Sequence, residues 1–288
     1  MNALGKIALG MLRGYSRIAP TERGGFRLSR LARRFVSEAN RTGTFQTPDG
    51  LRLNLDLRTY PDITMAVGLY ELDTARLIHR LLKPGAWFVD VGANLGYFTL
   101  LAAKWTAPAG RVDAFEPDPL NRQRLEQHLH ENALGDRVRI YPIAASSQAG
   151  ELELIHPQSA GANHGMASFY KSLAGEGTTF TVPTARLDEV LDGSPDLIKL
   201  DVEGAELAAI QGMEKTLRAS TPPKLIIEHN PTSCAAAGYR PGDIFTKLLQ
   251  FQSKYRIFWI GWRLKEIKSA DQLNSISRQG NILAATDS

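Results

Sequence analysis

Short apolar runs alternate with longer segments whose apolar positions recur every three or four residues, and this pattern predicts an α/β fold. The runs indicate buried strands, which we expect at residues 87–91, 111–116, 138–144, 196–201, 224–228, 255–261 and 282–285. The segments with helical spacing predict helices at residues 95–105, 118–133, 203–219 and 241–253. Because parallel strands need crossover connections, this alternation predicts a doubly wound parallel sheet.

Residues 1–65 are expected to form a basic N-terminal extension, and residues 66–288 the main domain. The Pro48-Asp49-Gly50 turn signal, followed by leucines at alternate positions, predicts a hairpin over residues 44–57. A helix at 71–82 and a short pairing strand at 151–155 are also expected. The first 18 residues fit an amphipathic helix, with an apolar face made of Leu4, Ile7, Ala8, Met11, Tyr15 and Ile18.

The composition is that of a folded protein, since 43% of the 288 residues are hydrophobic and 22% are charged. The single cysteine, Cys234, excludes a disulfide framework and a zinc site built from cysteines. The net charge is +4, but residues 1–41 hold nine basic and two acidic side chains and so carry +7. The remaining residues therefore sum to −3, which argues against nucleic acid as a partner of the folded domain.

No apolar run approaches the roughly 18 residues that a membrane-spanning helix needs, and the N-terminus does not resemble a signal peptide. We therefore expect a cytoplasmic protein. For residues 1–18, we favour either docking of the helix on its own domain or a frayed arm weakened by Gly5, Gly10 and Gly14. The alternative is peripheral contact with an anionic membrane surface through this basic amphipathic segment.

A glycine-rich turn between the first strand and its helix is the sharpest local signal, and it includes Asp90, Gly92, Ala93, Asn94 and Gly96. Glycines let the backbone approach a ligand beside a helix N-terminus, and asparagine tolerates a positive φ where a further glycine would be usual.

The next strand ends at Glu116, where a carboxylate can accept hydrogen bonds from ribose hydroxyls. Together with the glycine turn, this acid predicts a cofactor that contains a nucleoside. Dinucleotide sites usually have an apolar residue at the position of Asp90, whereas an acid there suits a cationic ligand. S-adenosylmethionine, which carries a sulfonium, is therefore favoured over NAD.

Two later strands also end in acids, Asp201 and Glu228, so four carboxylates are expected on one rim of the sheet together with Asp90 and Glu116. Such a rim would be repulsive without a cationic or hydroxyl-rich ligand. Asp201 is the first candidate base for a hydroxyl proton, followed by Glu228 or His229. A magnesium ion shared by Asp201, Glu203 and Glu228 is an alternative, but no metal is expected at the site.

Three blocks of sequence resemble the FkbM family of S-adenosylmethionine-dependent methyltransferases: Phe88–Leu100, Phe115–Pro117 and Asp196–Glu206. The resemblance covers about residues 70–230 and implies a Rossmann-like sheet of seven strands, the last antiparallel. It also implies that the Asp90–Gly96 turn holds the methionine part of the cofactor, that Glu116 holds the ribose, and that Asp201 faces the transferred methyl group.

The activity that the resemblance implies is methylation of a hydroxyl oxygen on a small molecule or glycan. We expect in-line displacement, catalysed mainly by positioning of the reactants. Residues 157–179, rich in Gly and Ser, are expected to form a loop that sets acceptor specificity. An N-methyltransferase acting on nucleic acid is one alternative, although Asn230-Pro231-Thr232-Ser233 lacks the second proline and the aromatic residue of such enzymes. A module that binds S-adenosylmethionine without catalysis is another.

Overall fold

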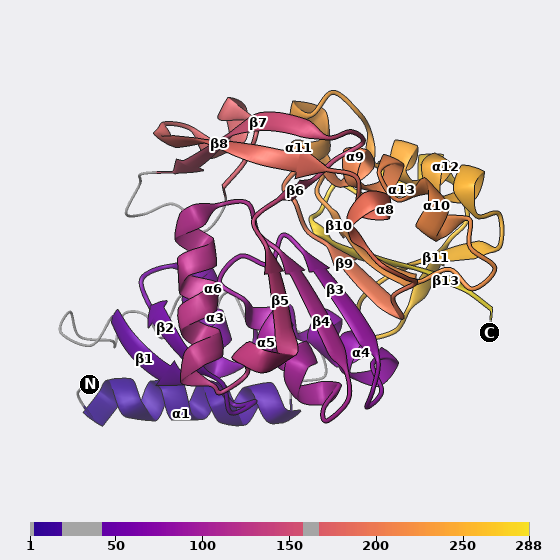
Figure 1. Cartoon of the computed structure of the whole chain (residues 1–288). Coiled ribbons are helices and arrows are strands. Elements are labelled where there is room, and N and C mark those ends of the chain that lie inside the picture. Colours follow the sequence, from indigo (N-terminus) through magenta and orange to yellow (C-terminus); the bar gives the residue numbers. More distant parts are fainter. Residues whose placement is uncertain (1–2, 19–41, 158–166, 288) are drawn as a thin grey trace.

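The computed structural model describes residues 3–18, 42–157 and 167–287, and an eight-stranded sheet forms its centre (Figure 1). The strand order is β12-β11-β13-β10-β9-β3-β4-β5. Five neighbouring strands are parallel, namely β3 (Trp87–Val91), β4 (Arg111–Phe115), β5 (Val138–Tyr141), β9 (Leu197–Leu200) and β10 (Lys224–His229). The burial of β3, β4, β9 and β10 on both faces explains their continuous apolar runs in the sequence, whereas the edge strand β5 is only partly buried.

The C-terminal strands close the sheet with the reversed strand that the sequence resemblance implies. β13 (Gly280–Thr286) runs antiparallel between β10 and β11 (Tyr255–Trp259). The predicted α/β sheet with an antiparallel last strand is therefore confirmed. An additional edge strand that was not predicted, β12 (Lys265–Ile267), pairs with β11.

Helices cover both faces of the sheet and enclose two apolar cores. One core includes side chains of α4 (Leu72–Leu81), α5 (Tyr97–Trp105) and α6 (Pro119–Glu131). The other includes side chains of α9 (Glu206–Gln211), α10 (Glu214–Leu217) and α12 (Pro241–Phe251). Short helical segments complete this part of the chain, namely η3 (Gly135–Arg137), α8 (Leu187–Val190), α11 (Pro231–Ala236) and α13 (Ala270–Asn274).

The single helix expected over residues 203–219 is wrong, because the structure has two short helices there. α9 ends at Gln211 and is followed by the C-cap residue Gly212, which has a low helix propensity and packs against a neighbouring chain segment. A Cβ atom on Gly212 would lie 2.0 Å from the carbonyl oxygen of Ser146. Glu203 lies in a turn before α9, with a φ of 49°, and is not a helical residue.

The predicted hairpin is present as β1 (Thr42–Gln46) and β2 (Arg52–Asp56), and it is part of the main core. The leucines at positions 51, 53, 55 and 57 are all buried. The boundary expected between residues 65 and 66 falls inside α3 (Tyr60–Val67). Leu53 and Ile63 share an apolar core with Phe88 of the central sheet, so the structure does not separate residues 42–65 from the rest.

The N-terminal helix α1 (Ala3–Ile18) docks on the domain, but not through the face predicted from the sequence. Leu9 and Leu12 are buried, whereas Ile7, Met11 and Ile18 are 51%, 71% and 82% exposed. The buried face is fixed by Arg13, which donates hydrogen bonds to the carbonyl oxygens of Ala66 and Gln46. Because the favoured side is set by tertiary contacts, helical periodicity alone did not identify it.

Contact with a membrane surface stays a prediction for the exposed face of α1. Within the described ranges, no helix combines the length and the apolar character needed to cross a bilayer.

A second, three-stranded sheet lies beyond the carboxyl ends of the central strands (Figure 1). It consists of β6 (Ala144–Ala145), β7 (Gly150–Pro157) and β8 (Gly177–Ala185), with β7 and β8 antiparallel. The sequence predicted only a short strand and a loop over residues 157–179. Part of that loop, residues 158–166, lies outside the described residues, and the rest contains α7 (Lys171–Ala174) and the start of β8.

Candidate active site

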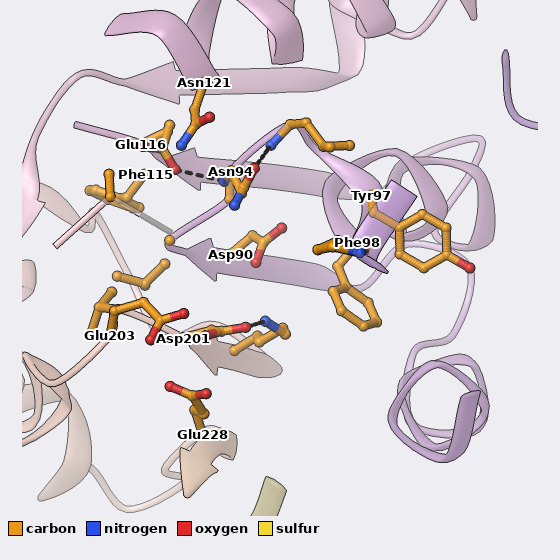
Figure 2. A pocket seen from close by; sticks show the side chains of 18 of the residues that line it. Asp90, Asn94, Tyr97, Phe98, Phe115, Glu116, Asn121, Asp201, Glu203 and Glu228 are labelled. Atoms are coloured by element: carbon orange, nitrogen blue, oxygen red, sulfur yellow. Dashed lines mark hydrogen bonds and ion pairs between the residues drawn. The ribbon is translucent and has the colours of Figure 1, made fainter. Parts of the chain in front are cut away.

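A cavity of about 320 Å³ opens at the carboxyl ends of β3, β4, β9 and β10 (Figure 2). The strands are in register there, since Val91 pairs with both Phe115 and Leu200. Residues that come directly after these positions therefore reach the same edge of the sheet. The cavity is lined by the four acids expected on this rim, Asp90, Glu116, Asp201 and Glu228.

The glycine turn after β3 is tightly packed between two strands. Gly92 has a φ of 83°, and its N–H and that of Ala93 donate to the carbonyl oxygen of Phe115. A Cβ atom on Gly92 would lie only 1.8 Å from the carbonyl oxygen of Asp201. Asn94 adopts the left-handed conformation, with a φ of 52°, as its position in the turn predicts. Gly92, Ala93 and Asn94 all line the cavity.

Gly96 is different, because it does not line the cavity and its predicted contact with a cofactor is not supported. It stands at the N-cap of α5 with a φ of 93°. A Cβ atom there would lie 2.3 Å from Cδ1 of Leu125 on α6. Close helix packing therefore accounts for this glycine.

Glu116 connects the glycine turn to the end of β4. Its Oε2 accepts a hydrogen bond of 2.6 Å from the backbone N–H of Asn94, and its Oε1 accepts one of 2.9 Å from the N–H of Asp118. The residue is buried, and this burial raises the pKa of Glu116 to about 8. Each carboxylate oxygen keeps a further lone pair, so the group can also accept ligand hydroxyls.

Asp90 lies deep in the same cavity and is 1% exposed. Its Oδ2 accepts a hydrogen bond of 2.6 Å from the hydroxyl of Thr99. Its Oδ1 is buried and has no hydrogen-bond partner among the described residues. Burial raises the pKa of Asp90, although the nearby Lys199 ammonium opposes this effect. A buried oxygen of this kind is a natural acceptor for a polar or cationic ligand.

Asp201 is held by a lysine from its own strand. The buried Lys199 ammonium donates to Asp201 Oδ2 at 2.7 Å and lies over the ring of Phe98 at 4.7 Å. Burial alone would lower the pKa of Lys199, but the carboxylates of Asp201, Glu71 and Asp90 raise it above its ordinary value. Lys199 therefore stays charged and orients Asp201 toward the cavity.

Glu203 and Glu228 complete the acidic wall. Burial, followed by the charges of Asp201 and Glu206, raises the pKa of Glu203 to about 8. Burial raises the pKa of Glu228 well above its ordinary value, and the charge of Asp201 adds to this shift. Gln279 donates a hydrogen bond of 2.6 Å to Oε1 of Glu228, while the buried Oε2 has no partner in the described part of the chain.

His229 is not placed for catalysis, which corrects its choice as a candidate base. It does not line the cavity; its Nε2 lies 3.0 Å from the carbonyl oxygen of Ile276, and its ring packs edge-on against Trp259. Because successive side chains of a strand point to opposite faces, Glu228 faces the cavity and His229 faces away.

Glu206 does not line the cavity and has a structural role. Its carboxylate accepts hydrogen bonds from the N–H groups of Val202 and Gly204 and from the hydroxyl of Tyr239. These contacts shape the turn that carries Glu203.

The sequence did not identify several residues that line the cavity. Glu71, with a φ of 40°, comes from the turn before α4 and accepts a hydrogen bond of 2.7 Å from Asn281 on β13. Lys199 left a signal, since a basic residue in the middle of an apolar strand needs a buried partner. Residues that reach the cavity from other segments carry no local motif. They include Tyr60, Pro61, Met65, Tyr70 and Phe169.

The geometry of the site defines a broad class of protein. A glycine turn after the first strand, an acid at the end of the second strand, and a cavity at the carboxyl edge are features of Rossmann-like proteins that bind nucleoside cofactors. Similarity to known families narrows this class. The model of the methyltransferase FkbM domain matches residues 90–256, more than half of the chain, and the chain belongs to this family.

Among its relatives, methyltransferase sdnD from Sordaria araneosa is 29% identical over an alignment of 163 residues, which covers 46% of this chain and 62% of sdnD. Hexuronic acid methyltransferase AglP from Haloferax volcanii is 28% identical, over 62% of this chain and 67% of AglP. The 2-O-methyltransferase NoeI from Sinorhizobium fredii is 28% identical, over 59% of this chain and 75% of NoeI.

The matched part of the chain thus spans less than two thirds of sdnD, and only 9% of the AMB antimetabolite synthetase AmbE from Pseudomonas aeruginosa, another relative. A crystal structure of methyltransferase FkbM from Methylobacillus flagellatus KT is 17% identical, with a TM-score of 0.46, over 78% of this chain and 55% of that one.

Proposed function

We propose that this protein transfers a methyl group from S-adenosylmethionine to a hydroxyl oxygen of a small-molecule or glycan acceptor. Family membership supports methyl transfer. The names of NoeI, a 2-O-methyltransferase, and AglP, a hexuronic acid methyltransferase, support an oxygen atom on a sugar-like acceptor. The observation that carries the proposal is the meeting of four strand-end carboxylates around one cavity.

The residues present suit S-adenosylmethionine. When bound, this cofactor supplies a methyl group on a positively charged sulfur. Glu116 would hold the ribose hydroxyls, because its carboxylate is fixed by two backbone N–H groups and keeps free lone pairs. The turn from Asp90 to Asn94 would hold the methionine part, where the unpartnered Oδ1 of Asp90 is available to a cationic or N–H-bearing group.

Asp201 is the residue that we assign to the acceptor hydroxyl. Lys199 occupies one carboxylate oxygen, Oδ2, and fixes the side chain, so the other oxygen can orient the hydroxyl or accept its proton. Glu228 stands beside it as the second candidate. On the outer side, Tyr60 and Met65 of α3 and Leu154 of β7 form part of the wall that an acceptor would contact.

Calorimetry tests the cofactor first. S-adenosylmethionine and S-adenosylhomocysteine should each bind with one site per chain, and NADH should not bind. Purified protein is then incubated with S-adenosylmethionine and a panel of hydroxylated metabolites and glycans. Release of S-adenosylhomocysteine and gain of one methylene by the acceptor are measured. Absence of cofactor binding would refute the proposal, whereas binding without transfer to any acceptor would favour a non-catalytic module.

Asp201→Asn tests the assignment of the catalytic residue. The variant keeps the shape of the side chain, so cofactor affinity should stay within about threefold, while turnover should fall by roughly a hundredfold or more. Undiminished turnover would remove Asp201 from the mechanism.

A further inference from the structure

Three carboxylates converge on one side of the cavity. Asp201, Glu203 and Glu228 come from the end of β9, the turn after it and the end of β10, and Figure 2 shows their side chains turned toward one another. One oxygen from each lies within 4.8 Å of the others. These acids line the cavity that we assign to methyl transfer, but neither the cofactor nor Lys199 accounts for all three.

Each of the three side chains has an oxygen available to a ligand. Lys199 occupies Oδ2 of Asp201, Gln279 occupies Oε1 of Glu228, and the Ser233 hydroxyl contacts Oε2 of Glu203 at 3.4 Å. In the described ranges, no hydrogen bond engages the second oxygen of Asp201 or of Glu203.

Glu228 supplies the independent indication that a ligand belongs here. The residue is 5% exposed, and its Oε2 is fully buried without a hydrogen-bond partner in the described part of the chain. A buried carboxylate oxygen in this state is costly unless something binds it. Lys199 is the one basic side chain among the described residues lining the cavity, and its ammonium is already bound to Asp201. No other cationic side chain there is available to Oε2 of Glu228.

We propose that Asp201, Glu203 and Glu228 bind a divalent cation of the hard, oxygen-seeking kind, such as Mg²⁺ or Mn²⁺. Carboxylates are the ligands that these ions prefer. Ligand oxygens of an octahedral Mg²⁺ ion lie about 3.0 Å apart when adjacent and about 4.2 Å apart when opposite, so binding would draw the three acids together from separations of up to 4.8 Å. Water or the acceptor would complete the coordination shell.

The inference rests on the proposed function for its chemical role. The acceptor hydroxyl oxygen would bind the cation, which lowers the pKa of the hydroxyl so that its proton passes to water. The oxygen's electron pair then forms the bond to the methyl carbon, and the electrons of the broken carbon–sulfur bond stay on sulfur. The products are a methyl ether, a neutral thioether and one proton, so charge and atoms balance.

The test is titration of the full-length chain, freed of metal with EDTA and then dialysed, with MnCl₂ by calorimetry and by electron paramagnetic resonance. One Mn²⁺ per chain is expected, displaced by excess Mg²⁺. Glu228→Gln and Glu203→Gln should each weaken binding by roughly tenfold or more. Asp113→Asn is the matched control, because this buried acid of β4 pairs with Trp87 and Arg111 and does not line the cavity, so affinity should stay within about threefold.

Circular dichroism first checks that each variant is folded, and a rise in melting temperature of the unaltered chain with Mn²⁺ gives a readout that needs no variant. Lack of saturable Mn²⁺ binding, or equal binding by Glu228→Gln and the unaltered chain, would overturn the metal site. Binding of S-adenosylhomocysteine in EDTA separates the two proposals. If S-adenosylhomocysteine binds but Mn²⁺ does not, only the metal site is refuted. If Mn²⁺ binds but S-adenosylhomocysteine does not, the proposed function is refuted.

Discussion

Gly92 shows how closely the glycine turn is built onto the strand beside it. A methyl group at this position would meet the Asp201 carbonyl oxygen at 1.8 Å, and the φ of 83° is itself unfavourable for alanine. Gly92→Ala should therefore destabilise the protein by about 3 kcal/mol or more and abolish binding of S-adenosylhomocysteine. Urea denaturation and calorimetry measure the two effects.

Gly85 provides the matched control for that substitution. Its φ of 88° is nearly the same, but a Cβ atom there would have no neighbour within 4 Å. Gly85→Ala should cost only the backbone strain, about 1–2 kcal/mol, and leave nucleoside binding intact. Equal losses in the two variants would show that backbone conformation, and not the contact with β9, explains Gly92.

The raised pKa of Glu116 predicts that cofactor binding depends on pH. Burial raises its pKa to about 8, so at neutral pH the empty pocket holds it mostly protonated. Ribose hydroxyls donate to the ionised form and would lower this pKa, so binding should release a proton. Affinity for S-adenosylhomocysteine should rise from about pH 6.5 to about pH 8, by at most about tenfold per pH unit, and then level off.

Calorimetry in buffers of different ionisation enthalpy measures the released proton, and Glu116→Gln should release less. If the affinity of Glu116→Gln for S-adenosylhomocysteine rises with pH as steeply as that of the unaltered chain, another group causes the effect. The effect of this carboxyl on folding stability in the protein without cofactor has the opposite pH dependence. Because its pKa is raised from 4.5 to about 8 on folding, its contribution to stability is greatest at low pH and is lost as the pH rises toward 8.

Individual site residues could be predicted where one strand end decided their position. Asp90, Glu116, Asp201 and Glu228 all follow or end apolar strands, and all reach the cavity. The prediction of His229 as a candidate base was wrong, because successive side chains of a strand point to opposite faces and His229 faces away from the cavity. Glu71 could not be predicted, since it enters the site through a left-handed turn and a contact with Asn281, far away in the sequence.

The larger elements were predicted where burial leaves a local pattern, as in the central strands. β8 (Gly177–Ala185) was missed because its residues are mostly polar or partly exposed and its pairing with β7 spans a long intervening segment. The break between α9 and α10 depends on the contact between Gly212 and Ser146, which a helical periodicity does not reveal.

α1 allows a direct test of which helix face is buried. Leu12 is 7% exposed and lies in the main core, so Leu12→Ala should weaken docking of the helix by about 2 kcal/mol. Met11 belongs to the face that the sequence favoured but is 71% exposed, and Met11→Ala should change stability by less than about 0.5 kcal/mol. Limited trypsin digestion after Arg13 and Arg17 reports the docking, and faster cleavage in Met11→Ala than in Leu12→Ala would contradict the observed orientation.

The molecule as a whole does not divide where the change in sequence character suggests. Basic charge is concentrated in residues 1–41, yet the hairpin and α3 that come after them are built into the core of the sheet domain. α3 also brings Tyr60, Pro61 and Met65 to the cavity wall. Charge composition therefore identifies the basic segment but not the limit of the folded unit.

Truncation tests where that limit lies. A chain that begins at residue 66 loses Leu9 and Leu12 of α1 and six further buried apolar side chains of the shared core, Leu51, Leu53, Leu55, Leu57, Ile63 and Met65. Each contributes about 1.5–3 kcal/mol, and a typical domain is stable by only about 5–15 kcal/mol, so this chain should fail to fold and to bind S-adenosylhomocysteine. A chain that begins at residue 42 keeps the last six of these side chains and loses the α1 contacts, so it should fold with lower stability and still bind the nucleoside. Circular dichroism, thermal denaturation and calorimetry distinguish the two; a folded, binding-competent chain starting at residue 66 would restore the boundary predicted from the sequence.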